Sequence, residues 1–600
     1  MPSIDEILPN VLTVAERAWT ELADPQEPTS KGKGLGDPPK WPEWALIFDT
    51  ETTTDATQAL LFGTYAVARL VGGRYVTPME GVFHADDLAQ ARPDELELLH
   101  AYADRHELRL VSRREFVKNV FLKVGYRMRG LIVGFNLPFD LSRIAIDVRE
   151  ARTRFKGGFS FILDGDERGE NRHAPRLRIK HAHNKLAFFQ FSKPHKPPRD
   201  MLIPDGSLDG KPVPHYAYPG RFLDLRTLTA VLTDRGHSLA SACTALAVPN
   251  GKHAVHQHGV ITEAYIDYAV QDTRATTALL NALKAEYDRH PIDLAPDKAY
   301  SSASIAKKYL QAMNLTAPLD VNLDLPPERL GQAMSAYYGG RSECRIRKTP
   351  VPVVYCDFLS MYPTVNAIMN TWRLLTAEKL EAVDATETVR ELLETVQLED
   401  VLDPSFWPDL HGYACIAPDG DVVPVRANYA YADGVAGYQI GVNPLHSVAD
   451  SWYALPDLIA AKLLSGDTPE VLEAWTLNAT GRQAGLQPVA LRGEDEIDPV
   501  REDFFKRVIE MRNEVKNDTS RPEEEWERQQ RFLKVLANSG SYGIYAEMNR
   551  HEPAKPEKLL VYAGDEPFKA KAIPDRTPSH PSPPSPPQPH ASCLPFSNAS

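Results

Sequence analysis

The chain has 600 residues, of which 43% are hydrophobic and 25% are charged, so it is long enough for several structural units with their own cores. No apolar run is long enough to cross a bilayer, and the acidic, amphipathic N-terminus has neither the basic region nor the apolar core of a signal peptide. Five scattered cysteines without a C-x-x-C pair argue for reduced thiols and against a zinc site, so we expect a cytoplasmic protein without membrane contacts.

The charge is uneven along the chain. The formal net charge is −14, which argues against a nucleic-acid-binding protein. Residues 101–200, however, contain 22 Lys and Arg against 11 Asp and Glu. A basic region inside an acidic chain is typical of a surface that contacts phosphates, but a solvated charged face gives the same pattern. Charge alone leaves both interpretations open.

The first forty residues are expected to form a helix and a linker. Residues 1 to about 24 are interpreted as one helix, and the stretch after them is rich in Pro, Gly and Lys and has no periodicity. We therefore predict a first unit at 1–40.

Residues 41–290 are predicted to form an α/β domain. Apolar runs predict strands at 45–48, 60–71, 74–83, 131–135 and 222–225. Residues 158–193 alternate as a hairpin, and helices are expected over 91–128 and from about 238 to 287. Acidic residues repeatedly follow the strands, so the pattern predicts a layered sheet with one carboxylate-lined face.

Four carboxylates can converge at this face. Asp49 and Glu51 lie two residues apart on an extended segment, so their side chains share a face. Asp140 follows the strand at 131–135, and Tyr268 and Asp272 are four residues apart on a helix, where they share a side. Four gathered acids repel one another unless divalent cations neutralise them, as in a two-metal phosphodiester hydrolase. We therefore expect Mg²⁺, with Mn²⁺ as a substitute, and a tyrosine that can orient the attacking water.

A second candidate site lies in the stretch VPVVYCDFLSMYPTVNAIMN, from Val351 to Asn370. Its β-branched start predicts a buried strand that carries Asp357 at its end, followed by a turn and a helix. A strand tip holds a metal-binding carboxylate rigidly with one side open to substrate. An aspartate that only caps the next helix would explain this stretch equally well.

Together and in this order, the motifs resemble those of family B DNA polymerases that carry a 3′–5′ exonuclease domain. The segments DTE, NLPFD and YAVQD resemble the three exonuclease motifs. Tyr337-Tyr338-Gly339-Gly340 resembles the Y-x-G-G link between the exonuclease and polymerase domains, and DFLSMYPT resembles polymerase motif A. Arg512-x-x-x-Lys516 and the segment from Lys534 to Gly543 resemble the fingers helices. The resemblance covers roughly residues 45 to 545.

The resemblance implies a multidomain fold of the α/β and α+β classes. An RNase H-like 3′–5′ exonuclease domain at 41–290 would be followed by a partial palm and fingers. The remaining units are a connecting segment at 291–345, a partial palm with an insertion at 346–500, fingers helices at 501–548 and an atypical Pro/Ser-rich tail at 549–600. Most of that tail cannot pack a core, so we expect it to be disordered.

The resemblance also implies roles for single residues. Exonuclease catalysis would use Asp49, Glu51, Asp140, Tyr268 and Asp272, with the four acids as metal ligands, and Asp357 would ligate both polymerase metals. Nucleotide contacts are implied for Tyr362, Arg512, Lys516, Lys534, Asn538 and Tyr542. DNA contacts are implied for Asn136, Phe139, Tyr338, Gly339 and Gly340. The implied partners are primer–template DNA, a single-stranded 3′ end and deoxynucleoside triphosphates. For Arg512 and Lys516 the alternative is a pair of surface cations partnered with nearby glutamates.

Two features depart from the family pattern. Tyr542 lies eight residues after Lys534, where the family has seven, so it falls about 80° away from the lysine's helical face. Either Ser541 takes that face, or a local bulge absorbs the extra residue. In addition, no D-T-D-like hairpin with the second polymerase acid follows Gly543. A truncated or frame-shifted copy would have this pattern.

Three functional hypotheses follow. The first is a family B DNA polymerase with proofreading that is incomplete at its C-terminus. The second is a metal-dependent 3′–5′ exonuclease whose polymerase half only helps to bind DNA. The third is a non-catalytic nucleic-acid-binding remnant. The presence of all the exonuclease acids favours the second over the third, and the missing second polymerase acid favours it over the first.

Overall fold

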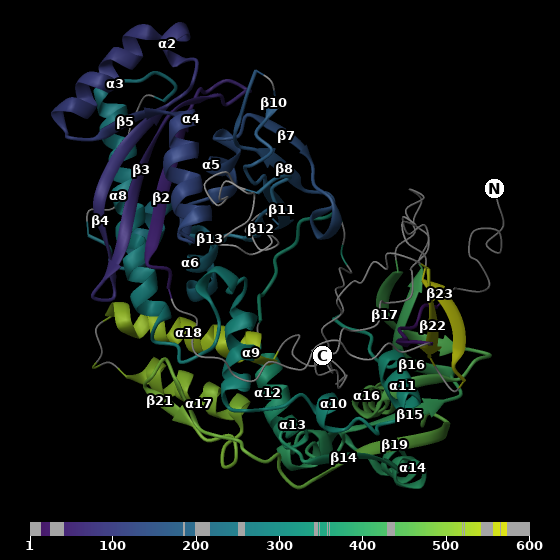
Figure 1. Cartoon of the computed structure of the whole chain (residues 1–600). Coiled ribbons are helices and arrows are strands. Elements are labelled where there is room, and N and C mark those ends of the chain that lie inside the picture. Colours follow the sequence, from purple (N-terminus) through teal and green to yellow (C-terminus); the bar gives the residue numbers. More distant parts are fainter. Residues whose placement is uncertain are drawn as a thin grey trace.

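The computed structural model describes residues 14–23, 41–167, 169–183, 186–197, 217–249, 258–340, 346, 348–356, 358, 360–428, 438–518, 520, 523–541, 556–563 and 566–572. Over these residues the chain is a mixed α/β protein with several sheets (Figure 1). No helix in the described part combines the length and apolar character needed to cross a membrane.

A six-stranded sheet organises the N-terminal half. Its strands are β2 (Trp44–Thr52), β3 (Leu60–Val71), β4 (Arg74–His84), β5 (Arg109–Ser112), β6 (Leu131–Gly134) and β13 (Arg221–Asp224). The spatial order is β13-β6-β2-β3-β4-β5. Strands β2, β3 and β4 form an antiparallel meander, and β6 and β13 add in parallel on the other side of β2. These strands confirm the sequence prediction, and most of their apolar residues are buried, apart from Val71 and Val76 near the β3–β4 turn.

Both faces of this sheet are covered. Residues of β2, β3 and β6 that point to one side pack against α6 (Leu225–Thr233), α7 (Leu239–Ala245) and α8 (Glu263–Tyr287). The alternate residues pack against α4 (Arg113–Phe116), two π-helical turns at 117–121 and 123–127, and a four-stranded sheet. That smaller sheet contains β7 (Asp147–Glu150), β8 (Phe159–Ile162), β11 (Leu177–His183) and β12 (Leu186–Phe191), which confirms the predicted hairpin region.

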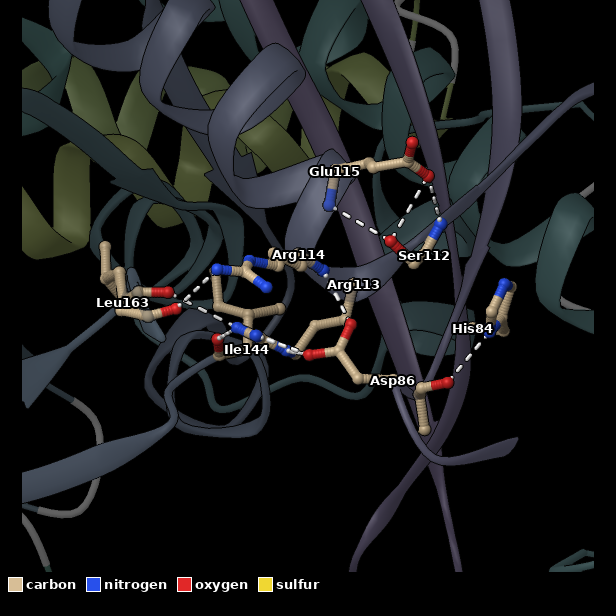
Figure 2. Close-up of polar contacts among 10 residues, drawn as sticks. His84, Asp86, Ser112, Arg113, Arg114, Glu115, Ile144 and Leu163 are labelled. Carbon is tan, nitrogen blue, oxygen red and sulfur yellow. Dashed lines mark hydrogen bonds and ion pairs between the residues drawn. The ribbon is translucent and has the colours of Figure 1, made fainter. Parts of the chain in front are cut away.

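The predicted helix over 91–128 is wrong in its middle. Helices α2 (Leu88–Ala91) and α3 (Pro93–Arg105) end before β5, which pairs in parallel with β4. Residues 109–112 pair with the outer edge of β4 instead of continuing the helix. Ser112 then caps a new helix and forms a capping box with Glu115 (Figure 2). Pairing with a neighbouring strand therefore outweighed the local helical pattern.

A single core joins the first domain to the helices near the C-terminus. Leu533 and Phe532 of α18 (Glu523–Ser541) pack in the same cluster as Tyr309 of α9 (Ser302–Ala312) and residues of α6 and α8. Helix α17 (Phe504–Asn517) enters this cluster through Phe504 and Phe505. Figure 1 shows α17 and α18 directly beneath the six-stranded sheet.

The remaining part of the chain forms a second α+β region. A sheet ordered β14-β19-β15-β18 packs against α14 and α16. Its strands are β14 (Lys379–Asp384), β15 (Gly412–Ile416), β18 (Ser451–Ala454) and β19 (Val471–Thr480). Two hairpins accompany it: β16 (Asp419–Asn428) with β17 (Tyr438–His446), and β20 (Val489–Leu491) with β21 (Asp495–Ile497). The helices are α10 (Pro318–Val321), α11 (Pro327–Ser335), α12 (Met361–Ile368), α13 (Thr371–Leu375), α14 (Thr386–Thr395), α15 (Leu398–Val401) and α16 (Leu455–Ser465).

The expectations for both ends of the chain need correction. Residues 19–22, predicted as helix, form β1 (Trp19–Leu22), which pairs with β22 (Glu557–Tyr562). The tail predicted at 549–600 contains a hairpin in which β22 pairs with β23 (Phe568–Ala572), so the expected disorder is wrong for these two strands. Alternating apolar residues of this hairpin are buried against β1 and α11, which explains why the strands form. The residues from 573 onward lie outside the described part.

The predicted strand that begins at Val351 does not form. Residues 351–356 have no regular structure, and Val353 and Val354 are 84% and 88% exposed. A strand needs a partner for its backbone groups, and none of the described strands pairs with this segment. The following helix does form, as α12.

Candidate active site

Three parallel strands end at the same edge of the large sheet. Ile47 of β2 lies beside Val133 of β6, and Asp224 of β13 lies beside Gly134. Asp49 therefore emerges next to the segment that leads from β6 into α5 (Leu137–Arg143). This register brings residues that are far apart in sequence to one edge, as the sequence predicted for Asp49 and Asp140.

Asp140 is the centre of the cluster. Its carboxylate is 2% exposed, and Oδ1 accepts hydrogen bonds from the Thr50 backbone N–H at 3.1 Å and the Thr50 hydroxyl at 2.7 Å. Oδ2 is buried and has no hydrogen-bond partner in the described part of the chain. Burial raises the pKa of Asp140 well above its usual value, and the charges of Asp49 and Asp224 raise it further. Burial and the neighbouring acids therefore both disfavour the ionised form of this carboxylate.

Asp224 belongs to this cluster and was missed as a site residue by the sequence analysis. Its Oδ1 accepts from the backbone N–H groups of Asn136 at 3.1 Å and Arg226 at 2.9 Å. Burial raises its pKa to about 6, although these hydrogen bonds lower it. The available signal was its position directly after an apolar strand, which it shares with Asp49.

Helix α8 contributes Tyr268 and Asp272 to the cluster. Tyr268 donates a hydrogen bond to Asp272, so the predicted i, i+4 pair does share a face. Burial first, and then Asp272, Glu51 and Asp49, raise the pKa of the Tyr268 phenol. The phenol therefore stays protonated, with four groups of the predicted set close to one another.

Tyr265 is a further residue that the sequence analysis did not single out. Its hydroxyl donates to Glu51 Oε2 at 2.5 Å, and its ring stacks near Tyr268 with 6.2 Å between centroids. Glu51 lies at a register shift between β2 and β3, and such β-bulges often re-aim a side chain next to an active site. The spacing of Tyr265, one turn before Tyr268, was the signal for it.

The donor set suits a hard divalent cation in its chemistry, because every candidate ligand is a carboxylate oxygen. The buried, unpartnered Asp140 Oδ2 fits such an ion as well. Within the described residues, however, no group of three or more His, Cys, Asp or Glu side chains is arranged to hold a metal ion. The acids are therefore gathered, but they do not form a closed ligand set in this conformation.

Two residues predicted to contact DNA border the cluster. Asn136 is exposed, has φ +71° and precedes α5, and its side-chain oxygen accepts from Arg226 at 3.1 Å. Phe139 is half-buried, and the Arg143 guanidinium lies 5.0 Å from its ring centre. Both residues therefore lie within about four positions of Asp140, and Asn136 is solvent-exposed.

The predicted nucleotide-binding residues lie on three adjoining helices. Tyr362 is on α12, Arg512 is on α17, and α18 contacts both of these helices. Arg512 Nη1 donates to the Ser360 hydroxyl at 2.9 Å, and burial lowers the pKa of Arg512. Arg512 therefore contacts the segment just before α12, and its role in nucleotide binding stays a prediction.

The other predicted nucleotide-binding residues are exposed or half-buried, or lie outside the described residues. Lys516 and Lys534 are exposed, and Asn538 is half-buried on the same helix as Lys534. Asp357 and Tyr542 lie outside the described residues, so their predicted roles stay predictions.

The Y-x-G-G segment follows α11. The Tyr338 ring is 6% exposed and stacks on Tyr453 with 5.4 Å between centroids, so this side chain is part of a core and does not line a surface that DNA can reach. Gly339 has φ +88°, and Gly340 is exposed. Of the three residues predicted to contact DNA here, only the two glycines leave their backbone accessible.

The chain is similar to two polymerases of known structure. The Phi29 DNA polymerase complexed with single-stranded DNA aligns with 89% of this chain and 74% of its own length, at 12% identity and a TM-score of 0.34. The family B DNA polymerase from the hyperthermophilic archaeon Pyrobaculum calidifontis aligns with 88% of this chain, at 13% identity and a TM-score of 0.26. The chain spans about half the length of that second polymerase, 51%. No family model and no curated protein matches the sequence. Likeness at these TM-scores assigns neither an activity nor a residue role.

Proposed function

We propose that this chain is a metal-dependent 3′–5′ exonuclease for single-stranded DNA, built on a family B polymerase plan. The observation that carries the proposal is the cluster around Asp140, where Asp49 and Asp224 add their charges to a buried carboxylate with an unpartnered oxygen. The sheet supports an RNase H-like domain, since an antiparallel meander is extended by two parallel strands with acids at their ends.

The roles of the residues follow from their surroundings. Asp49 and Asp140 would hold a Mg²⁺ or Mn²⁺ ion, which would neutralise their like charges and polarise the scissile phosphate. Glu51, fixed by the Tyr265 hydroxyl, would complete the charged wall. Tyr268 keeps its proton and can orient a water toward the phosphorus, as a general positioning group.

Substrate binding would use the residues that border the acidic cluster. Phe139 can stack on an unpaired base, and Asn136 can donate from its amide to the sugar or phosphate. Stacking on a single aromatic ring favours single-stranded over duplex DNA. The proposed setting is the cytoplasm.

Template-directed DNA synthesis is the second candidate. The contact of Arg512 with Ser360 supports it, because it brings a cation to the start of α12, where Tyr362 lies. The segment at 351–356 argues against DNA synthesis, because it is exposed and pairs with no described strand. A catalytic Asp357 would need rigid support from this segment. We propose that this half contributes DNA and deoxynucleoside triphosphate contacts, with little synthesis by the chain as it stands.

The exonuclease proposal is tested with a 5′-labelled oligonucleotide in Mg²⁺ or Mn²⁺. The chain is expected to shorten it from the 3′ end, and Asp49→Ala should slow this by several orders of magnitude because a metal ligand is lost. Asp104→Ala, which removes an exposed acid from α3, is the matched control and should hydrolyse at the parental rate. Equal activity of Asp49→Ala and the parent would reject the site.

Synthesis is tested separately on Asp49→Ala/Asp140→Ala, because hydrolysis would otherwise remove the product. We expect little primer extension, since two ions about 3.5–4 Å apart need more than one fixed carboxylate. Robust template-directed extension would show that the polymerase site is complete and would favour the second candidate.

A further inference from the structure

A separate groove lies between α4 with its π-helical continuation and the loop region around β9 (Gly165–Asp166) and β10 (Gly169–Glu170). It is a cavity of about 570 Å³. One wall carries Arg114, Lys118, Leu122 and Tyr126, which follow one another at four-residue spacing along one helical face. π-Helical turns are rare and are frequently found at functional sites, so this wall is a candidate for binding.

Cations outnumber carboxylates in this groove. Its positively charged residues are Arg114, Lys118, Arg127, Arg172 and Lys196, and its carboxylates are Asp164, Asp166 and Glu170. Glu170 is already paired with Arg176, whose hydrogen bonds lower the Glu170 pKa. Asp164 accepts a hydrogen bond from the Asn171 side chain at 2.7 Å. The carboxylates are therefore partly engaged by other groups.

Three of the cations form no ion pair within the described part of the chain. Lys118, Arg172 and Lys196 are exposed, and none of them makes an ion pair with another described residue. Arg114 donates to the Gly165 carbonyl at 3.1 Å, which is a neutral acceptor. Like charges lining a concave surface repel one another, and a bound anion would relieve this repulsion.

The two walls are held together by one buried arginine (Figure 2). Arg113 Nη1 donates to the carbonyls of Ile144 at 2.9 Å and Leu163 at 3.3 Å, and Nη2 pairs with Asp86 at 2.5 Å. The Arg114 backbone N–H donates to the same aspartate at 2.9 Å. The start of the helical wall is thereby fixed to Leu163, which lies between β8 and β9, so the groove is preorganised for a ligand.

We propose that this groove binds the sugar–phosphate backbone of single-stranded nucleic acid. A cavity of this volume falls within the range of about 300–1,000 Å³ typical of small-ligand sites, so it can take a few phosphates of one strand but not a duplex. Tyr126 is buried and offers no stacking face, so binding would be electrostatic and independent of sequence.

The groove is linked to the candidate active site through Arg113 and α5. Ile144, which Arg113 holds, directly follows the helix that carries Phe139 and Asp140. A strand lying in the groove would therefore be kept near the site that trims it. In this relation alone the inference rests on the proposed exonuclease function, because binding itself needs no hydrolysis.

The test measures binding of a labelled dT20 strand to the full chain in EDTA, so that no cleavage occurs. The variant Lys118→Ala/Arg172→Ala/Lys196→Ala should bind at least about tenfold more weakly at low salt. Its slope of log K against log salt should fall by about 2, since each lost phosphate contact removes about 0.7 in single strands. Lys118→Arg/Lys196→Arg should bind like the parent, because it keeps both charges.

The matched control is Arg69→Ala/Arg74→Ala/Arg105→Ala. It removes three exposed charges from the same domain at a distance from the groove, and should change affinity and slope much less. Equal losses in the two triple variants would mean that only overall charge matters and would overturn the proposal. Full competition by dTMP or inorganic phosphate at millimolar concentration would also overturn it, in favour of a small-anion site.

Hydrolysis gives a second readout that separates the two proposals. The groove variant should cleave a dinucleotide at the parental rate while losing activity on long strands. A parent that binds dT20 through the groove but hydrolyses nothing would refute the exonuclease and leave the groove standing. An unchanged thermal melting curve excludes misfolding of the variant as the cause.

Discussion

Protonation of His290 is expected to loosen the junction between the first domain and the C-terminal helices. His290 is 6% exposed, and its Nδ1 lies 2.7 Å from the Tyr309 hydroxyl. Its ring packs against Phe532 of α18 with 5.0 Å between centroids. Burial, together with the charges of Arg492 and Arg289, lowers its pKa from 6.5 to about 3. The imidazolium is therefore strongly disfavoured at this position.

The size of this loss of stability follows from the pKa values of His290 in the unfolded and the folded chain. The unfolded chain takes up a proton as the pH falls through 6.5, whereas the folded chain stays neutral down to about 3. Stability is therefore lost progressively below pH 6.5. Between pH 7 and pH 5 this single group should remove about 2 kcal/mol from the free energy of opening, and more at lower pH.

The assay compares the parent with His290→Phe, which keeps an aromatic ring of similar size but cannot be protonated. Hydrogen exchange of the amides in α9 at pH 5 and pH 7, corrected for intrinsic rates, gives the local opening free energy in each protein. The parent should lose about 2 kcal/mol more than the variant between the two pH values. The same pH dependence in both proteins would refute the reasoning, because the titrating group would then lie elsewhere.

Three further outcomes are expected. Tyr265→Phe removes the hydroxyl that holds Glu51, so hydrolysis of single-stranded DNA should fall about 10- to 100-fold while binding in EDTA is unchanged; full activity would exclude this positioning role. Leu559→Ala truncates a side chain that is 1% exposed in β22 and should cost about 2–5 kcal/mol locally, visible as faster proteolysis near β1; unchanged proteolysis would argue against this pairing. Lys534→Ala should weaken nucleotide binding and leave hydrolysis intact, whereas a loss of both would indicate misfolding.

Local sequence patterns were sufficient for much of the candidate active site. Short apolar runs followed by Asp49 and Asp140 correctly predicted strands with acids at one sheet edge, because burial of a strand on both faces demands such runs. The four-residue spacing of Tyr268 and Asp272 likewise predicted that both lie on one helical face, and in the structure the two side chains are hydrogen-bonded.

Contacts between residues distant in sequence determined the features that local patterns did not predict. β1 is a strand because β22, from the opposite end of the chain, offers it a pairing edge, and no local signal reports such a partner. The run at Val351 has the composition of a strand and remains exposed, because strand formation depends on a neighbour as much as on propensity. Asp224 joins the Asp140 cluster only through the register of β13 on β6. Side-chain composition thus specifies which segments can be buried, whereas partners distant in sequence determine which segments pair and which charges meet.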